Sequence, residues 1–198
     1  MVKNNHVPKG SSCLVEPIRE LKDIEAIKKM LVSNTRDELL FCLSINNGLR
    51  MSDILQLKIK DLIHLKPGEM VNIKEKKTGK ANVVCLNKQV FKILHQYLED
   101  RKPYIEDEYI FISKKGNNKP LQVSTASLMV KRWCKSINLN GNFGSHSLRK
   151  TWGYHQRTRY GVETELLMKR FCHSSMGITL RYIGLQDKQV NDLLLNEI

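Results

Sequence analysis

Apolar residues recur three and four positions apart through most of the chain, and this spacing predicts helices with one buried face. The predicted helical segments are 18–31, a segment from Asn34 or Thr35 to Gly48, 90–98, 124–137, 145–160 and 163–171. Gly48 ends the second of them, since glycine readily takes the left-handed conformation that follows a helix. Three serines at helix starts, Ser52, Ser124 and Ser145, are expected to serve as N-caps.

Shorter apolar runs predict a small sheet. Val71-Asn72-Ile73 and Asn82-Val83-Val84-Cys85-Leu86 read as two strands joined through Lys77-Thr78-Gly79-Lys80, a hairpin with lysines at its tip. Tyr109-Ile110-Phe111-Ile112 predicts a third strand, before the polar loop 114–120. The expected fold is therefore mainly α (α+β), a helical domain with a small three-stranded antiparallel sheet.

The chain is expected to form one domain. Residues 1–17 are polar and contain Pro8, Gly10 and Pro17, which predicts a flexible lead-in, and residues 18–198 form the compact part. No apolar run approaches the roughly 20 residues that span a bilayer, and the first residues form no signal peptide. We therefore expect a cytoplasmic protein without a membrane partner.

The charge of the chain points to a polyanionic partner. The sequence has 33 Lys and Arg against 20 Asp and Glu, a formal net charge of +13. Nucleic acid is the first candidate and an acidic membrane surface the second. The five cysteines are scattered without a CxxC pair, so neither disulfides nor a zinc site is predicted, and Cys172 beside His173 is not expected to act as a nucleophile.

The first candidate for chemistry is His146-Ser147-Leu148-Arg149. His146 and Arg149 are three residues apart and project from one face of the predicted helix, whose N-terminus favours an anion. The alternative is a capping histidine and a surface ion pair, and the motif is short enough that it favours this alternative when taken alone.

His173 and Tyr182 form the second candidate pair. They are nine residues apart, so an unbroken helix would place them on opposite faces. The segment 174–177 can break the helix, and Thr179 is positioned to cap a new one that carries Tyr182. The alternative is that Tyr182 is a half-buried core aromatic.

Arg50 follows Gly48-Leu49, and Asp53 lies three residues later. Asp53 is close enough to orient the guanidinium by a charge-assisted hydrogen bond, although a structural ion pair is the simpler interpretation of these two residues alone. The occurrence of all these groups in this order, on a basic chain with a lysine-tipped hairpin, favours a site that holds and attacks a phosphodiester.

The combined pattern resembles the catalytic domain of tyrosine recombinases, the phage-integrase family. The motifs are Gly48-Leu49-Arg50 with Asp53, Lys77-Thr78-Gly79-Lys80, His146-Ser147-Leu148-Arg149-Lys150-Thr151, and His173-Ser174-Ser175 before Tyr182. The resemblance covers residues 18–198 and implies a fold related to type IB topoisomerases. It also implies double-stranded DNA as partner, assembly as a multimer on DNA, and a mechanism without a metal ion or other cofactor.

The resemblance assigns roles to six catalytic residues. Tyr182 would attack the scissile phosphate, forming a 3′-phosphotyrosyl link and freeing a 5′-hydroxyl. Arg50 and Arg149 would hold the non-bridging oxygens and stabilise the transition state. His146 and His173 would bond the phosphate and handle the tyrosine proton.

Lys77 would protonate the departing 5′-oxygen, with Lys76 and Lys80 as neighbouring alternatives, and Asp53 would brace Arg50. Further basic residues are expected to contact DNA phosphates: Lys74, Lys76, Lys80, Lys131, Arg132, Lys135 and Lys150.

Several features depart from the family pattern. Cys172 replaces a common Gly, and Gly184 stands where many members carry another His. The helical core-binding domain that usually precedes the catalytic domain is absent, which leaves open a minimal member, a fragment or a protein that works with a partner. The alternative functions are a DNA-binding repressor or accessory factor with the same fold and, on charge alone, a ribonuclease or RNA-binding protein. The apolar stripe of residues 190–198 predicts a helix that docks on its own domain or on a neighbouring protomer.

Overall fold

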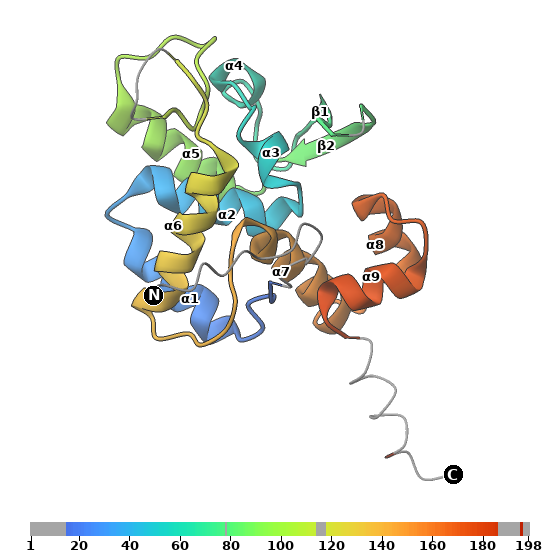
Figure 1. Ribbon diagram of the computed structural model, residues 1–198. Helices are drawn as coiled ribbons and strands as arrows, with labels where there is room; N and C mark the ends of the chain where they lie inside the picture. Colours follow the sequence, from blue (N-terminus) through green and yellow to red (C-terminus); the bar gives the residue numbers. More distant parts are fainter. Residues whose placement is uncertain (1–14, 78, 114–117, 186–194, 196–198) are drawn as a thin grey trace, which may run out of the picture.

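A computed structural model describes residues 15–77, 79–113, 118–185 and 195 of the chain. Its elements in chain order (Figure 1) are α1 (Leu21–Leu31), α2 (Thr35–Asn47), α3 (Met51–Ile54), α4 (Ile59–Leu62), β1 (Met70–Lys74), β2 (Ala81–Cys85), α5 (Lys88–Arg101), α6 (Val123–Ser136), α7 (Ser145–Thr158), α8 (Thr164–Phe171) and α9 (Met176–Ile183). The mainly helical fold with one small antiparallel sheet confirms the prediction.

The main core is built around α2. Six consecutive residues of this helix, 39–44, are buried, so α2 is covered on every side, whereas an amphipathic surface helix would bury one stripe. Helices α1, α5 and α7 pack directly against it, and α6 packs against α7. Asn34 caps the start of α2 and Gly48, with φ of 59°, ends it, as the sequence predicts.

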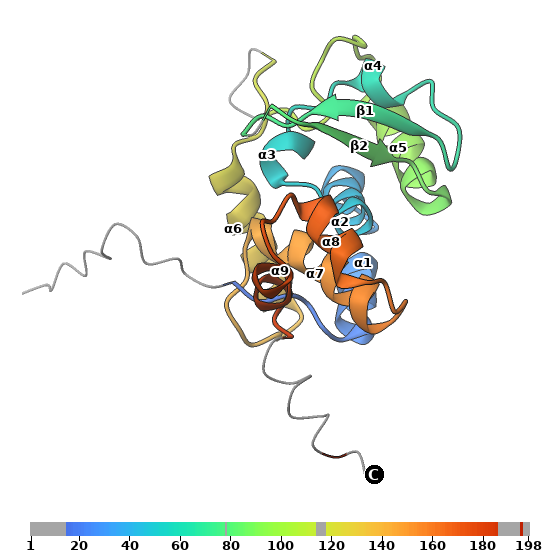
Figure 2. The same cartoon turned by 90° about the vertical axis from the view of Figure 1, so that its right-hand side faces the viewer.

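Helices α8 and α9 form a pair with a small core of its own. Leu167 and Phe171 of α8 meet Ile183 of α9 and Leu185, and Trp152 of α7 packs against this cluster. Figures 1 and 2 show the α8–α9 pair beside α7 and below the hairpin of β1 and β2. The pair is therefore joined to the main core largely through α7.

The sheet has two strands in the described part of the chain, and the prediction of a third was wrong. β1 and β2 pair antiparallel with Met70 opposite Cys85 and Lys74 opposite Ala81. Residues 109–112 form isolated bridges instead, Lys58 with Tyr109 and Ile112 with Pro120. Their backbone groups bond to segments 57–59 and 119–121, so this stretch links two loops and does not extend the hairpin.

Several predicted helix starts are shifted by a residue or more. Helices α3, α6 and α7 begin after Arg50, Gln122 and Gly144, and none of these three uses the serine predicted as its cap. The cap of α9 is Ser175, whose side chain accepts from the amide of Ile178, so Thr179 lies inside the helix. These serines were correctly placed near helix starts, but the backbone geometry that makes a cap is not readable from residue type alone.

Parts of several predictions fall outside the described residues. These are residues 1–14 of the lead-in, Thr78, loop residues 114–117 and the apolar stripe of the tail. In the described part, no helix is long and apolar enough to cross a membrane.

The contact of α7 with the α8–α9 pair depends on a glycine. A Cβ at Gly153 would lie 2.6 Å from Cζ of Phe171 and 2.9 Å from Cγ2 of Ile183, both buried atoms of the small core. Gly177 on α9 is the opposite case, since a Cβ there would meet nothing within 4 Å.

We predict that Gly153→Ala destabilises the fold by about 1–3 kcal/mol through overpacking, although alanine is the better helix former by about 1 kcal/mol. The control Gly177→Ala should be neutral or slightly stabilising, because it gains propensity without a clash. Urea unfolding followed by circular dichroism measures both variants. A Gly153→Ala protein as stable as the control would contradict this account of the α7 contact.

Candidate active site

Arg149 lies at the centre of the site. It projects from the second turn of α7, is 3% exposed, and donates from Nη1 to the carbonyl of Gly48 (2.9 Å) and from Nη2 to the carbonyl of Phe171 (3.1 Å). The guanidinium carbon also lies 4.8 Å from the centre of the Phe171 ring. One side chain thus joins the end of α2 to the end of α8 and, being fixed at both, is held in a single orientation.

Tyr182 on α9 lies against this arginine and against His173. The centres of the Tyr182 and His173 rings are 5.0 Å apart, and the Tyr182 and Phe171 rings are 5.2 Å apart. Burial raises the pKa of Tyr182. Arg149 acts in the opposite direction, both by its charge and by a hydrogen bond to the phenol, and the charge of Arg50 also lowers this pKa. The phenol is therefore protonated at neutral pH, and its deprotonation needs a nearby base.

His173 is oriented by Thr179. Its Nδ1 lies 3.1 Å from Oγ1 of Thr179, which is buried and donates its own proton to the carbonyl of Ser175 at 3.3 Å. With the hydroxyl proton used there, Nδ1 of His173 is assigned as the donor and Nε2 carries the free lone pair. Burial lowers the pKa of His173, and Arg149 and Arg50 lower it further, so at neutral pH the ring is a neutral acceptor.

The break between α8 and α9 occurs at Cys172. Its φ of 56° lies in the left-handed region, where glycine is unstrained. This explains physically why a glycine is common at this position in the family that the chain resembles. The turn brings His173 and Tyr182 to a common point, as the sequence predicts, with Cys172 exposed to solvent.

His146 is exposed in the first turn of α7, one turn before Arg149. Partial burial lowers its pKa, and the charges of Arg149, Lys150, Arg50 and Lys77 add to this effect. His146 therefore faces a cationic environment at the N-terminus of α7, where an anion would be stabilised. Binding of a phosphate there would raise the pKa of the imidazole again.

Arg50 has Glu75 as its ion-pair partner, and this corrects the prediction that Asp53 braces it. Nη1 of Arg50 contacts Oε2 of Glu75, whose side chain is fully buried. Asp53 instead accepts from the amide of Lys76 at 3.0 Å, and it thereby fixes the base of the hairpin. The sequence did not point to Glu75 as the partner, because Glu75 lies in the hairpin, 25 positions after Arg50, and only the fold brings it there.

The hairpin places its lysines near this cluster. Its turn is closed by the bonds from the amide of Gly79 to the carbonyl of Glu75 and from the amide of Glu75 to the carbonyl of Lys80, both 2.9 Å. Lys77 is exposed within this turn, and its charge reaches His146. Lys74, Lys76 and Lys80 are exposed on the same hairpin.

Lys150 differs from the surface cation that the sequence suggested. Its residue is 6% exposed, its ammonium donates to the carbonyl of Val15 at 2.8 Å, and Nζ lies 5.0 Å from the centre of the Tyr182 ring. A cation held in this way under an aromatic ring supports Tyr182 and is not free to meet a phosphate. This placement does not favour DNA contact by Lys150, which stays a prediction.

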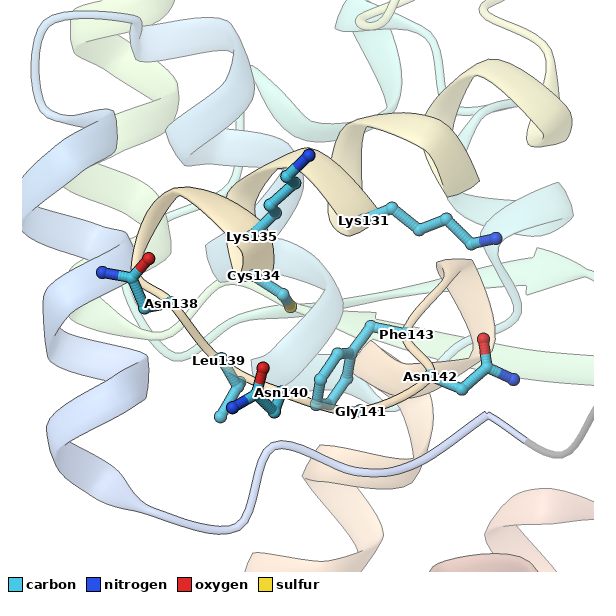
Figure 3. Close-up of a pocket in the computed structure, with 9 residues that line it drawn as sticks. All are labelled: Lys131, Cys134, Lys135, Asn138, Leu139, Asn140, Gly141, Asn142 and Phe143. Atoms are coloured by element: carbon cyan, nitrogen blue, oxygen red, sulfur yellow. The ribbon is translucent and has the colours of Figure 1, made fainter.

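The remaining predicted cations lie along α6. Lys131, Arg132 and Lys135 are exposed, and Figure 3 shows Lys131 and Lys135 projecting from α6 beside the loop that follows it. Lys131 and Lys135, with Asn138, Asn140 and Asn142, line an open hollow of about 680 Å³. Ammonium and amide groups are common partners of the nucleic-acid backbone.

The described residues contain no cluster of three or more His, Cys, Asp and Glu side chains that could hold a metal ion. The positive charge of the site comes from side chains of three separate segments, Arg50, Lys77 and Arg149, which the fold brings close enough to lower the pKa of one histidine together. The chemistry this arrangement supports is stabilisation of an oxyanion, with a phenol and a neutral imidazole beside it.

Comparison with known proteins identifies the family of the chain. The model of the phage integrase family matches residues 19–189. A probable integrase/recombinase of Bacillus subtilis (strain 168), YoeC, is 35% identical over 88% of this chain and 92% of its own length. The tyrosine recombinase XerA of Pyrococcus horikoshii is 28% identical over 98% of this chain and 64% of its own length.

Among solved structures, the XerH site-specific recombinase bound to a palindromic difH substrate superposes with a TM-score of 0.73. It shares 24% identity over 91% of this chain and 52% of its own length, so this likeness concerns the fold. The chain thus spans nearly all of the Bacillus relative but only about half to two thirds of the other two proteins. On the family match and the Bacillus relative together, the chain belongs to the phage integrase family.

Proposed function

We propose that this protein is a site-specific DNA recombinase that cuts and rejoins double-stranded DNA through a 3′-phosphotyrosyl intermediate. The observation that carries the proposal is the contact of Tyr182 with both Arg149 and His173. A phenol placed between a fixed guanidinium and a neutral imidazole has a charge stabiliser and a proton acceptor at hand.

In the cleavage step the phenolic oxygen of Tyr182 attacks the phosphorus, and the bond from phosphorus to the 5′-oxygen breaks. His173, with Nε2 free, takes the phenolic proton, and Lys77 gives a proton to the leaving 5′-oxygen. Arg50 and Arg149 hold the non-bridging oxygens while charge accumulates on them. His146 donates a further hydrogen bond at the N-terminus of α7.

Rejoining reverses these roles. The 5′-hydroxyl of a second strand attacks the phosphotyrosine and the deprotonated Lys77 takes its proton. The bond from phosphorus to the tyrosine oxygen breaks, and protonated His173 returns a proton to release the phenol. The phosphodiester count is unchanged, so no external energy source is needed. No step uses a metal ion or other cofactor, because the arginines supply the positive charge.

The DNA backbone would lie across the exposed cations of the hairpin and of α6. These are Lys74, Lys76, Lys80, Lys131, Arg132 and Lys135. XerH is described in complex with its difH substrate, and a λ integrase as a dimer on a core site, which supports DNA as partner and assembly of several protomers on it. Action on chromosomal or mobile-element DNA would place the protein in the cytoplasm at the nucleoid.

The alternative function is a repressor or accessory factor that binds DNA without cutting it. Such a protein needs the basic face but not the contact of Tyr182 with Arg149 and His173. A covalent protein–DNA product therefore separates the two functions.

We predict that the protein forms a denaturation-resistant adduct with a nicked suicide duplex carrying the repeats that flank its gene. Tyr182→Phe should abolish the adduct and leave DNA affinity nearly unchanged, because only the nucleophile is lost. The exposed Tyr160→Phe is the matched control and should behave as wild type. An adduct that persists in the Tyr182→Phe protein would mean another nucleophile, and none with wild type would favour the repressor.

Lys77→Ala should slow cleavage of ordinary DNA about 100-fold or more, within the range of general acid catalysis. On a substrate whose bridging 5′-oxygen is replaced by sulfur the loss should nearly disappear, because a thiolate leaves without a proton. Lys66→Ala, at another exposed lysine, should leave both rates unchanged. Equal slowing of Lys77→Ala on both substrates would assign the proton to another group, with Lys80 tested next.

Binding should weaken steeply with salt, since each neutralised phosphate adds about 0.9 to the log–log slope. Replacing Lys131, Arg132 and Lys135 together by Gln should lower this slope by roughly two to three units. Replacing Lys22, Lys29 and Lys92 by Gln removes equal charge from α1 and α5 and should lower it by less than about one unit. The measurement is fluorescence anisotropy across a salt series, and equal slopes for the two triple variants would place the DNA elsewhere.

A further inference from the structure

Arg170 is a half-buried cation for which the proposed cleavage mechanism has no direct role. It lies in the last turn of α8, and its guanidinium donates to three acceptors on two other elements. Nη2 bonds the carbonyl of Asn47 at 2.7 Å and the carbonyl of Val83 at 2.9 Å, and Nη1 bonds Oδ1 of Asn82. This planar fork therefore ties α8 to the end of α2 and to β2.

The contact with Asn82 continues toward the site. Asn82 is 8% exposed, and its Nδ2 donates to Oε1 of Glu75 at 2.7 Å. The other carboxylate oxygen of Glu75 holds Arg50. A continuous series of polar side-chain contacts thus runs from Arg170 through Asn82 and Glu75 to Arg50.

The two ends of this series of contacts belong to different halves of the site. Arg170 lies three residues before His173, on the α8–α9 pair that carries Tyr182. Glu75 lies two residues before Lys77 and its carbonyl and amide close the hairpin turn. The pair and the hairpin have separate packing, and Figures 1 and 2 show them as neighbouring but distinct parts of the molecule.

We propose that Arg170 is a positioning residue that, through Asn82 and Glu75, holds Arg50 and the lysine hairpin in register with the α8–α9 pair. The role rests on the proposed function, since register matters only if Tyr182 and Lys77 act on opposite sides of one phosphate. A lysine at this position keeps the positive charge. Its single ammonium group, however, lacks the planar set of donors with which the guanidinium bonds several acceptors at once. A displacement of about 1 Å is enough to cost roughly 100-fold in rate.

The first test uses the free protein and needs no DNA. Hydrogen exchange is measured for wild type, Arg170→Lys and Lys169→Gln, the last being an exposed cation on the same helix. Arg170→Lys should speed exchange of the Glu75 and Gly79 amides by about five- to tenfold, as for the loss of a buried hydrogen bond. The amides of α2 and α5 should exchange as in wild type, and Lys169→Gln should change neither set.

The second test asks whether the effect passes through Arg50. Arg170→Lys should slow cleavage of the suicide duplex about 100-fold, with its Kd for DNA within about threefold of wild type. A methylphosphonate at the scissile position removes the charge that Arg50 neutralises, so on that substrate the defect should shrink markedly. Glu75→Gln combined with Arg170→Lys should slow cleavage by much less than the product of the two single effects, because both act on one chain of contacts.

The outcomes are distinguishable. Unchanged hairpin exchange in Arg170→Lys, or faster exchange throughout the core, would overturn the positioning role, the second outcome meaning that Arg170 serves only stability. An equal loss of cleavage on both substrates would also overturn it. If wild type cuts neither duplex, the proposed function fails, and the exchange measurement still decides whether Arg170 sets the position of the hairpin.

Discussion

The buried guanidinium of Arg149 is the interaction on which the rest of the site depends. It satisfies the carbonyl that ends α2 and the carbonyl that ends α8, so it joins the main core to the small core of the α8–α9 pair. A cation with so little exposure is tolerated because its protons meet fixed acceptors and its face meets Phe171. The same group is in contact with Tyr182, so the fold and the proposed chemistry use one side chain.

The site has more positive than negative side chains, so an anion bound there would be stabilised. Burial is the main cause that lowers the pKa values of Arg149 and Arg170. Arg50 lowers the pKa of Arg149 further and Arg149 lowers that of Arg170, while Glu75 acts in the opposite direction on both arginines. Burial is also the largest cause of the lowered pKa values of the two histidines next to this cluster, and the charges of the neighbouring arginines lower them further. A phosphodiester bound among these groups would relieve the repulsion, which is how a site built from side chains can stabilise the transition state of phosphoryl transfer without a metal.

The site also lies at a boundary between parts of the fold. The helix that carries the proposed nucleophile packs in a small cluster, the proposed general acid is on a two-stranded hairpin, and the arginines between them come from α7 and the start of α3. Parts with so little shared apolar packing are held in register by polar contacts, in particular those of Arg149, Glu75 and Arg170. Small relative shifts of these parts would change catalysis before they changed the stability of the main core.

The sequence by itself predicted most of the helices, the hairpin and the six residues that the resemblance to the family names, because helical spacing, glycine positions and motif order are local properties of the chain. It did not determine that 109–112 bridges two loops, that Lys150 supports Tyr182, or that Glu75 and not Asp53 pairs with Arg50. Asp53 was the natural expectation because it is near in sequence. Only the tertiary structure decided these partners, since a buried charge takes whichever opposite group packing brings to it, and that group can lie anywhere along the chain.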